Sequence, residues 1–243
     1  MKKKIKKSGF DNNLTNYGDI EFSSYLRRSF AKSMGYTDES LNKPIVGIIN
    51  TSSGFNSCHR HFPEMIDALK RGINSNGCLP VEFPVISLGE VYLHPTSMMF
   101  RNLMSMDVEE MIRAQPLDAV VLLGGCDKTL PAMIMGAISA QKPFVVLPAG
   151  PMITSKFENN RLGACTDCRR YWSNYREGKI SRHKISEVEN KLASSAGTCS
   201  VMGTASTMAC ISEVMGLCLT DSSCVQAVYS ERLNIAEKTG VIC

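Results

Sequence analysis

The sequence predicts an α/β fold: a layered domain with a largely parallel sheet flanked by helices, followed by a helical C-terminal part. Short runs rich in β-branched and other apolar residues alternate with segments whose apolar residues recur at helical spacing. Polar loops follow these runs, as they do where a strand passes into a helix. The 243 residues suffice to bury a sizeable core, and no repeat or linker divides them.

The first two strands are predicted in the first third of the chain. Residues 44–50 form an apolar, β-branched run and predict a buried strand. The apolar spacing of residues 62–73 predicts the helix that follows. Residues 79–87 predict an edge or irregular strand, because Pro80 and Pro84 cannot donate hydrogen bonds to a neighbouring strand.

The middle of the chain continues the alternation. Residues 98–114 predict a helix, and residues 117–123 predict the clearest central strand. A further helix is expected at residues 131–140 and a short buried strand at residues 143–147. Together these elements predict a parallel sheet whose connections are helical.

The remaining part is predicted to be loop-like and then helical. Residues 154–179 are polar and predict a loop with three aromatic residues that pack, Tyr171, Trp172 and Tyr175. Helices are expected from Ile185 onward and at residues 225–238. An amphipathic helix between them is marked by Met208, Ile211, Met215 and Leu219.

Charge and hydropathy exclude several classes of protein. Lysine and arginine number 27 against 23 aspartates and glutamates, and residues 2–7 hold five of the lysines. A nucleic-acid binder would spread basic residues over a whole face, so no nucleic-acid partner is expected. No apolar run reaches the ~18 residues of a membrane helix, and none follows the basic start as in a secretory signal. We expect a cytoplasmic protein with a basic, frayed segment at residues 1–17 and a folded domain at residues 18–243.

Three of the ten cysteines lie on loops beside predicted strands or helices. In a reducing compartment, cysteines serve as core thiols or metal ligands more often than as disulfides. Cys58 lies among basic residues, Cys126 follows two glycines, and Cys199 lies at a predicted helix N-terminus that would stabilise a thiolate. The three can converge on one metal or cluster, although their long separation in sequence matches no local zinc pattern. For Cys126 a buried structural thiol remains the equal alternative.

The other cysteines are predicted to be structural. Cys165 and Cys168 have the CxxC spacing, but a zinc site needs a second pair and the chain has none with that spacing. Four more fall on predicted helices or their edges and are expected to be small core residues: Cys78, Cys210, Cys218 and Cys224. The sequence gives Cys243 no context.

Charged residues lie on the same loops. Glu90 and Asp127 are candidate Mg²⁺ ligands, because hard cations prefer carboxylate oxygens, and solvated loop acids are the alternative. Lys128 is either a charge partner of Asp127 or a buried lysine with an altered pKa. His59 and His61 are either ligands and proton carriers or hydrogen-bonded loop histidines.

Four segments are specific enough to indicate a family. They are PVEFPVISLGE, PTSMMFRNLMSMDVEEMI, LDAVVLLGGCDKTLPAMIMGA and AGTCSVMGTASTMA. From about Gly18 to the C-terminus the chain resembles the dihydroxy-acid and sugar-acid dehydratases, and is most similar to their pentonate branch of arabinonate and xylonate dehydratases. The resemblance covers the N-terminal domain of that family only.

The resemblance implies a hydro-lyase that uses a 2Fe–2S cluster and Mg²⁺. It implies that Cys58, Cys126 and Cys199 bind the cluster. It also implies that Glu90 and Asp127 bind Mg²⁺, with Lys128 carboxylated on its amine as a third oxygen ligand. The implied reaction removes water from a 2,3-dihydroxy carboxylate, either a sugar acid or a branched-chain dihydroxy acid, and yields a 2-keto-3-deoxy acid.

The chain departs from the family in length. Members are more than twice as long, and their second, β-rich domain, which supplies the proton-abstracting serine, is missing here. Two hypotheses follow: the N-terminal portion of a working dehydratase, or a non-catalytic cluster-binding fragment or redox-sensing module. The expected partners are a small hydroxy acid and either further copies of the chain or a separately encoded C-terminal half. The sequence leaves the choice of substrate open.

Overall fold

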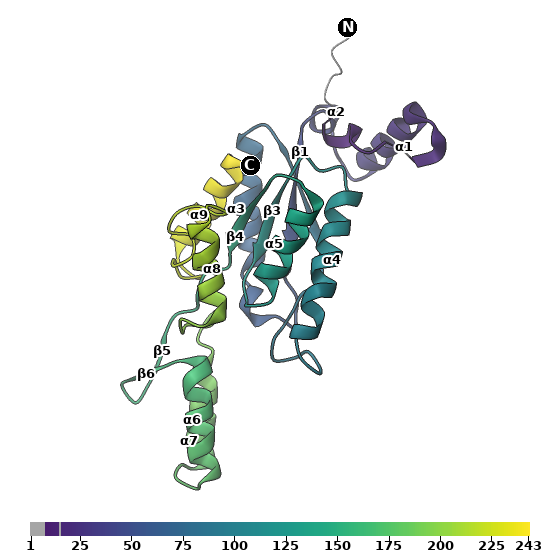
Figure 1. Cartoon of the computed structure of the whole chain (residues 1–243). Helices are drawn as coiled ribbons and strands as arrows, with labels where there is room; N and C mark the ends of the chain where they lie inside the picture. The colour runs from purple at the N-terminus through teal and green to yellow at the C-terminus, as the bar shows by residue number, and fades with distance from the viewer. Residues whose placement is uncertain (1–7, 15) are drawn as a thin grey trace.

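The computed structural model describes residues 8–14 and 16–243, and its centre is a four-stranded parallel sheet (Figure 1). The strands are β1 (Ile45–Asn50), β2 (Leu79–Pro84), β3 (Ala119–Gly124) and β4 (Phe144–Pro148), in the order β2-β1-β3-β4. The α/β prediction is confirmed, with β3 inside the sheet and the proline-containing β2 at its edge.

Helices cover both faces of the sheet (Figure 1). On one face lie α3 (Phe62–Ser75) and α9 (Ser230–Ile242), and on the other lie α4 (Met98–Ala114) and α5 (Thr129–Ala140). Successive residues of β1 alternate between the two cores, because a strand directs its side chains to opposite faces. Ile49 belongs to the core of α4 and α5, whereas Ile48 belongs to the core of α3 and α9.

Two glycines allow α3 and α9 to pack backbone to backbone. A Cβ on Gly72 would lie 2.0 Å from the carbonyl oxygen of Glu237, and one on Gly240 would lie 2.5 Å from that of Leu69. Only glycine permits so close an approach. The C-terminal helix is thereby fixed against the sheet and becomes part of the body of the molecule.

The segment that precedes the sheet packs on the edge of the body. It contains three short elements and one longer helix: η1 (Gly9–Asp11), η2 (Asn16–Gly18), α1 (Ile20–Ser33) and α2 (Asp38–Leu41). Phe10 and Leu14 are buried, and the carboxylate of Asp118 accepts the N–H of Gly9 at 2.7 Å. Within the segment predicted to be frayed, Phe10 and Leu14 are therefore packed, while the lysine run lies outside the described residues.

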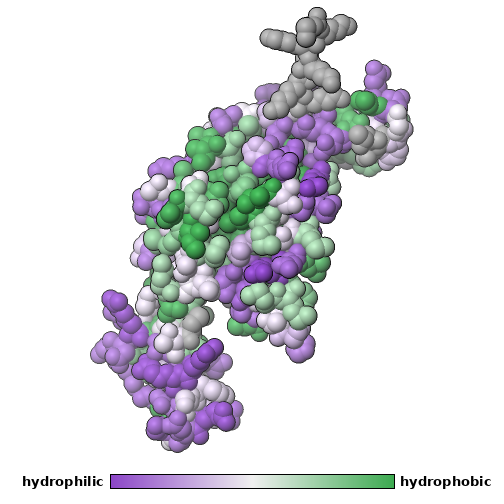
Figure 2. All heavy atoms as spheres, viewed as in Figure 1, coloured by the Kyte–Doolittle hydropathy of each residue, from purple (hydrophilic) through white to green (hydrophobic). Residues whose placement is uncertain are grey.

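A helical hairpin projects from the body (Figure 1). Its parts are the β5–β6 hairpin (Ser155–Phe157 and Asn160–Leu162), α6 (Ala164–Arg176) and α7 (Arg182–Leu192). The prediction of a loop over residues 154–179 was wrong: the segment is mostly polar, yet Cys168, Tyr171, Trp172 and Tyr175 recur at helical spacing within α6. Tyr171 packs as expected, but Trp172 is 54% exposed. We call residues 155–192 the arm; its surface is mainly hydrophilic (Figure 2).

The remaining described elements are η3 (Ser57–His59) and α8 (Thr204–Val214). The helix predicted to extend to Leu219 ends at Val214, and the last helix begins at Ser230 instead of at residue 225. Within the described part of the chain, no helix combines the length and the apolar character that a membrane span requires.

Candidate functional site

The three predicted thiols gather at one edge of the sheet. Cys58 lies on η3, in the loop after β1, and Cys126 follows β3 directly. Cys199 lies before α8, on a loop that runs beside the end of β4 through the bridge between Pro151 and Thr198. Ligands of open α/β sheets bind at this edge, where the strands end. The structure therefore brings together the loops that the sequence analysis singled out.

Backbone contacts hold the loop of Cys199 against the other two. The N–H of Gly197 donates to the carbonyl oxygen of Cys58 at 3.2 Å. A Cβ on Gly125 would lie 2.8 Å from the Cγ2 of Thr198, so only glycine allows the loop before Cys126 to approach this closely. Gly125 of the GGCDKT motif thus has a packing function.

Cys58 and Cys126 form an interacting pair of thiols. Hydrogen bonding between them lowers the pKa of Cys58 and raises that of Cys126 well above the ordinary value, with burial of Cys126 acting in the same direction. Cys58 is thus the better thiolate of the pair. Cys126 has a φ of +54°, which is strained for a residue with a side chain. Such strain persists where the surroundings enforce it, commonly at functional sites.

His59 connects the loops of Cys58 and Cys126. Its Nε2 accepts the N–H of Gly125 at 3.0 Å, and its Nδ1 lies 3.0 Å from the carbonyl oxygen of Thr51. Burial lowers the pKa of His59 to about 4, so the ring is neutral and donates through Nδ1. The ring also stacks on Phe62 at 4.4 Å between centroids. Both nitrogens are engaged, so His59 is a hydrogen-bonded loop histidine and not a metal ligand.

His61 is held at one ring nitrogen only, since among the described residues its buried Nδ1 has no hydrogen-bond partner. Its Nε2 lies 2.8 Å from the carbonyl oxygen of Ala149, which follows β4. Burial, and to a lesser degree the charge of Arg232, lower the pKa of His61. The histidines therefore tie the loop of Cys58 to the ends of β3 and β4, a function that sequence spacing alone did not distinguish from metal binding.

Two carboxylates converge on one amine beside the thiols. Nζ of Lys128 lies 2.8 Å from Oε2 of Glu90 and 2.8 Å from Oδ2 of Asp127. Burial alone would lower the pKa of Lys128, but its hydrogen bonds to the two carboxylates raise it overall. The amine is therefore a cation, and it occupies the position between two carboxylates where a metal cation would also be favourable.

Two hydroxyl groups complete this arrangement and were missed by the sequence analysis. Oγ1 of Thr204 donates to Oδ2 of Asp127 at 2.9 Å, and Oγ of Ser97 donates to Oε2 of Glu90. Both lie in the quoted segments, PTSMM and GTASTM, but a hydroxyl has no distinctive spacing. Their hydrogen bonds fix the orientation of the carboxylates.

The residues fit the two groups that the resemblance implies. Across residues 8–14 and 16–243, no three His, Cys, Asp or Glu side chains meet closely enough to hold a single metal ion. A 2Fe–2S cluster takes four protein ligands over its two irons, so three thiols on three loops would supply three of them and leave one position open. Carboxylate oxygens match the ligand preference of Mg²⁺. Mg²⁺ is commonly held by one or two carboxylates and several waters, so Glu90 and Asp127 fit it, and the resemblance implies a third oxygen from a carboxylated Lys128.

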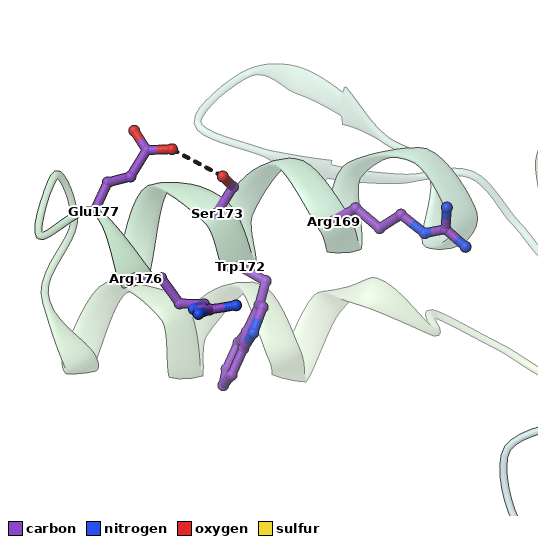
Figure 3. Close-up of a pocket in the computed structure, with 5 residues that line it drawn as sticks. All are labelled: Arg169, Trp172, Ser173, Arg176 and Glu177. Carbon is purple, nitrogen blue, oxygen red and sulfur yellow. Dashed lines mark hydrogen bonds between the residues drawn. The ribbon is translucent and has the colours of Figure 1, made fainter.

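Hollows on the arm involve none of these residues. One, of about 440 Å³, is lined by Arg169, Trp172, Ser173, Arg176 and Glu177 (Figure 3). Ser173 donates to Glu177 at 2.9 Å on its rim. Cys168 lines a second hollow on the same arm. The side chain of Cys165, the other half of the CxxC pair, lies outside the described part of the chain.

The fold is thus a parallel α/β sheet that carries thiols and a cluster of two carboxylates and a lysine on the loops at its carboxyl edge. A sequence model of the family "Dihydroxy-acid/6-phosphogluconate dehydratase N-terminal" matches residues 43–243. The chain belongs to this family, and the resemblance inferred from its motifs is confirmed.

The relatives carry dehydratase names. L-arabonate dehydratase from Azospirillum brasilense is 43% identical over 93% of this chain and 39% of its own length. 6-deoxy-6-sulfo-D-gluconate dehydratase from Pseudomonas putida is 41% identical over 84% of this chain and 35% of its own length. Dihydroxy-acid dehydratase from Methanococcus maripaludis is 34% identical over 88% of this chain and 40% of its own length. The chain thus spans about two fifths of these relatives, and the family is one of hydro-lyases.

Proposed function

We propose that this chain supplies the cofactor-binding, N-terminal part of a hydro-lyase. The enzyme would remove water from a 2,3-dihydroxy carboxylate, a sugar acid or a branched-chain dihydroxy acid, to give a 2-keto-3-deoxy acid. The observation that carries this proposal is the convergence of the loops of Cys58, Cys126 and Cys199 beside the two carboxylates that share Lys128. The names of the relatives support the reaction class.

The thiols of Cys58, Cys126 and Cys199 would hold a 2Fe–2S cluster, and Glu90 and Asp127 would hold Mg²⁺. When bound, the two groups would supply Lewis-acid activation of the substrate's carboxylate and leaving hydroxyl. The lowered pKa of Cys58 favours the thiolate that an iron ligand requires. Thr204 and Ser97 would keep the carboxylates oriented through the reaction.

Lys128 would change its chemical form when the metal binds. As an ammonium it neutralises Glu90 and Asp127, whereas as a carbamate it would provide a third oxygen ligand. Carboxylation needs the neutral amine, and the raised pKa of Lys128 disfavours that form while both carboxylates bind it. We therefore propose that carboxylation follows Mg²⁺ binding. ¹³C-bicarbonate should give a carbamate NMR signal with Mg²⁺ present and none without it, and Lys128→Met should abolish that signal.

An exposed apolar face supports the proposal of a protein partner. Met135 and Ile138 on α5 and Ile211 and Val214 on α8 are exposed, and Figure 2 shows hydrophobic surface over these helices. A second copy or a C-terminal half would cover such a face. We also propose a reducing, cytoplasmic compartment, in which the free thiols of the described cysteines would persist. Light scattering of the purified chain measures its assembly directly.

Anaerobic reconstitution with iron and sulfide tests the proposal. The chain should bind two irons and two sulfides and absorb in the visible range. It should then be assayed for 2-keto-3-deoxy acids with L-arabinonate, D-xylonate and a branched-chain dihydroxy acid, alone and mixed with the C-terminal part of a relative. Product formed by the chain alone or by the chain with the C-terminal part supports the hydro-lyase. A bound cluster without product in either assay favours the cluster-binding fragment or redox module. Failure to bind a cluster contradicts both this alternative and the hydro-lyase.

A further inference from the structure

Arg232 on α9 is a fully buried arginine held mainly by backbone carbonyl groups. Its side chain is 0% exposed. Its Nη1 donates to the carbonyl oxygens of Pro148 at 3.1 Å and Ser222 at 2.7 Å, and its Nη2 donates to that of Val225. Within the described residues no carboxylate lies at ion-pair distance from the guanidinium, and its Nε has no hydrogen-bond partner. Burial lowers its pKa to about 10, which still leaves it charged at neutral pH.

A buried charge of this kind is costly and calls for an explanation. Buried charged groups are normally paired with an opposite charge. Carbonyl dipoles replace that partner here, and all three carbonyls belong to irregular or terminal backbone. The guanidinium therefore joins α9, the end of β4 and the loop between α8 and α9.

The turn at the end of β4 lies directly against Arg232. Gly150 has a φ of +78°, and a Cβ there would lie 2.6 Å from Nη2 and 2.8 Å from Nε of Arg232. The carbonyl oxygen of Gly150 accepts the N–H of Thr198 at 2.9 Å, and Thr198 in turn accepts the N–H of Met152 at 2.8 Å. The residue after Thr198 is Cys199. The guanidinium thus supports the turn that holds the loop of Cys199.

The same turn reaches the other two cysteine loops through Ala149. Its carbonyl oxygen is bound by His61, three residues after Cys58, at 2.8 Å. Its N–H donates at 2.8 Å to the carbonyl oxygen of Gly124, two residues before Cys126. The segment Pro148–Gly150, which we call the β4 turn, therefore contacts all three cysteine loops.

We propose that Arg232 is the positioning residue of the cluster site: it fixes the β4 turn so that Cys58, Cys126 and Cys199 face one centre. The inference rests on the proposed function for the identity of the cluster, but the positioning itself exists in the cofactor-free chain. Removing the guanidinium leaves buried carbonyl groups without donors, so the turn and the loops that depend on it should open more often.

The test compares Arg232→Gln and Arg232→Lys with Arg71→Gln. Arg71 lies on α3 and pairs at the surface with Glu237 of α9, so its variant controls for loss of an arginine between these helices. The first readout is the rate of thiol alkylation in the cofactor-free chain, resolved by mass spectrometry. Arg232→Gln should react about tenfold faster at Cys58, Cys126 and Cys199, while Cys78, at the opposite edge of the sheet, keeps its rate.

The second readout is spectroscopic. After reconstitution, Arg232→Gln should show an altered visible circular dichroism spectrum and altered EPR of the reduced cluster, and should lose iron to a chelator about tenfold faster. Arg232→Lys should restore part of each effect, because its ammonium donates to fewer of the carbonyls. Arg71→Gln should match the wild type in every measurement.

Three results separate the outcomes. Wild-type rates and spectra in folded Arg232→Gln would overturn the positioning function. If that variant fails to fold, Arg232→Lys decides, because faster alkylation confined to the three site cysteines supports the proposal and an even increase at Cys78 contradicts it. If the wild type binds no cluster, the proposed function fails, and the alkylation experiment still decides the function of Arg232.

Discussion

The body of the molecule and the arm differ in how much they bury and in what they hold. In the body, the strands are buried on both faces and their terminal loops are fixed by backbone hydrogen bonds, Gly197 to Cys58 and Ala149 to Gly124 among them. The arm has a core of four buried residues, Phe157, Leu162, Tyr171 and Val188, and nine basic against five acidic residues. Every predicted site residue lies on the body, because holding several ligands in place requires loops anchored on a rigid sheet.

The largest expected effect distinguishes the body's thiols from its other cysteines. Cys126→Ser should abolish binding of the cluster, because a serine hydroxyl is a poor iron ligand and Cys126 lies between the other two loops. Iron and sulfide per chain after reconstitution measure this. Cys78→Ser, just before β2 at the far edge of the sheet, is the control and should bind a full cluster. A full cluster in Cys126→Ser would contradict the assignment of Cys126 as a cluster ligand.

Core substitutions should separate the two regions energetically. Ile49→Ala in the body removes buried methyl groups between β1 and the helices and should cost about 2–5 kcal/mol of unfolding free energy. Val188→Ala in the arm should loosen the arm with little effect on the body. Trp172, the single tryptophan, reports on the arm through its fluorescence, while far-UV circular dichroism reports on the whole chain.

Urea unfolding followed by both signals checks this. Ile49→Ala should shift the circular dichroism midpoint more than the fluorescence midpoint, and Val188→Ala should do the reverse. Coincident transitions in both variants would show that body and arm unfold as one unit.

Acidification should cause a loss of folding stability that is similar to or smaller than that of the core substitutions. His59 has a folded pKa of about 4, against about 6.5 when unfolded, so between these values the unfolded chain binds more protons. The stability that the neutral ring contributes is complete above pH 6.5 and is lost as the pH falls toward 4, by about 3 kcal/mol. The lowered pKa of His61 acts in the same direction.

Urea denaturation of the cofactor-free chain from pH 7 to pH 4 measures this dependence. His59→Gln should flatten it, whereas His183→Gln, on the exposed face of α7, should leave it unchanged. An equally steep loss of stability in His59→Gln would assign the acid sensitivity to other groups.

The same contrast explains what the sequence could predict. The helix at residues 98–114 and the strands around Ile48 and Val121 were predictable, because continuous or periodic apolar residues require burial. α6 was instead predicted as a loop because its composition is mostly polar, although Cys168, Tyr171 and Tyr175 recur at helical spacing within it.

The candidate site likewise contains residues that the sequence could indicate and residues that it could not. Loops after predicted strands indicated Cys58 and Cys126, since strand ends share an edge in a parallel sheet. Spacing could not show that Thr204 binds Asp127, or that Arg232 supports the turn beside Cys199. These contacts join residues far apart in sequence, and neither a hydroxyl nor a single arginine has a pattern that identifies its partner.

The smallest expected effect concerns the exposed surface of the arm. Trp172 lines both hollows and contacts Tyr175 at 5.5 Å between ring centroids, yet it is more than half exposed. Trp172→Ala should therefore change the free energy of unfolding, measured by far-UV circular dichroism, by less than about 0.5 kcal/mol. It should also leave iron binding unchanged, because none of the three cysteine loops contains this residue. A loss of stability as large as that of Ile49→Ala would mean that the arm is energetically part of the body, and the division between the two regions would no longer hold.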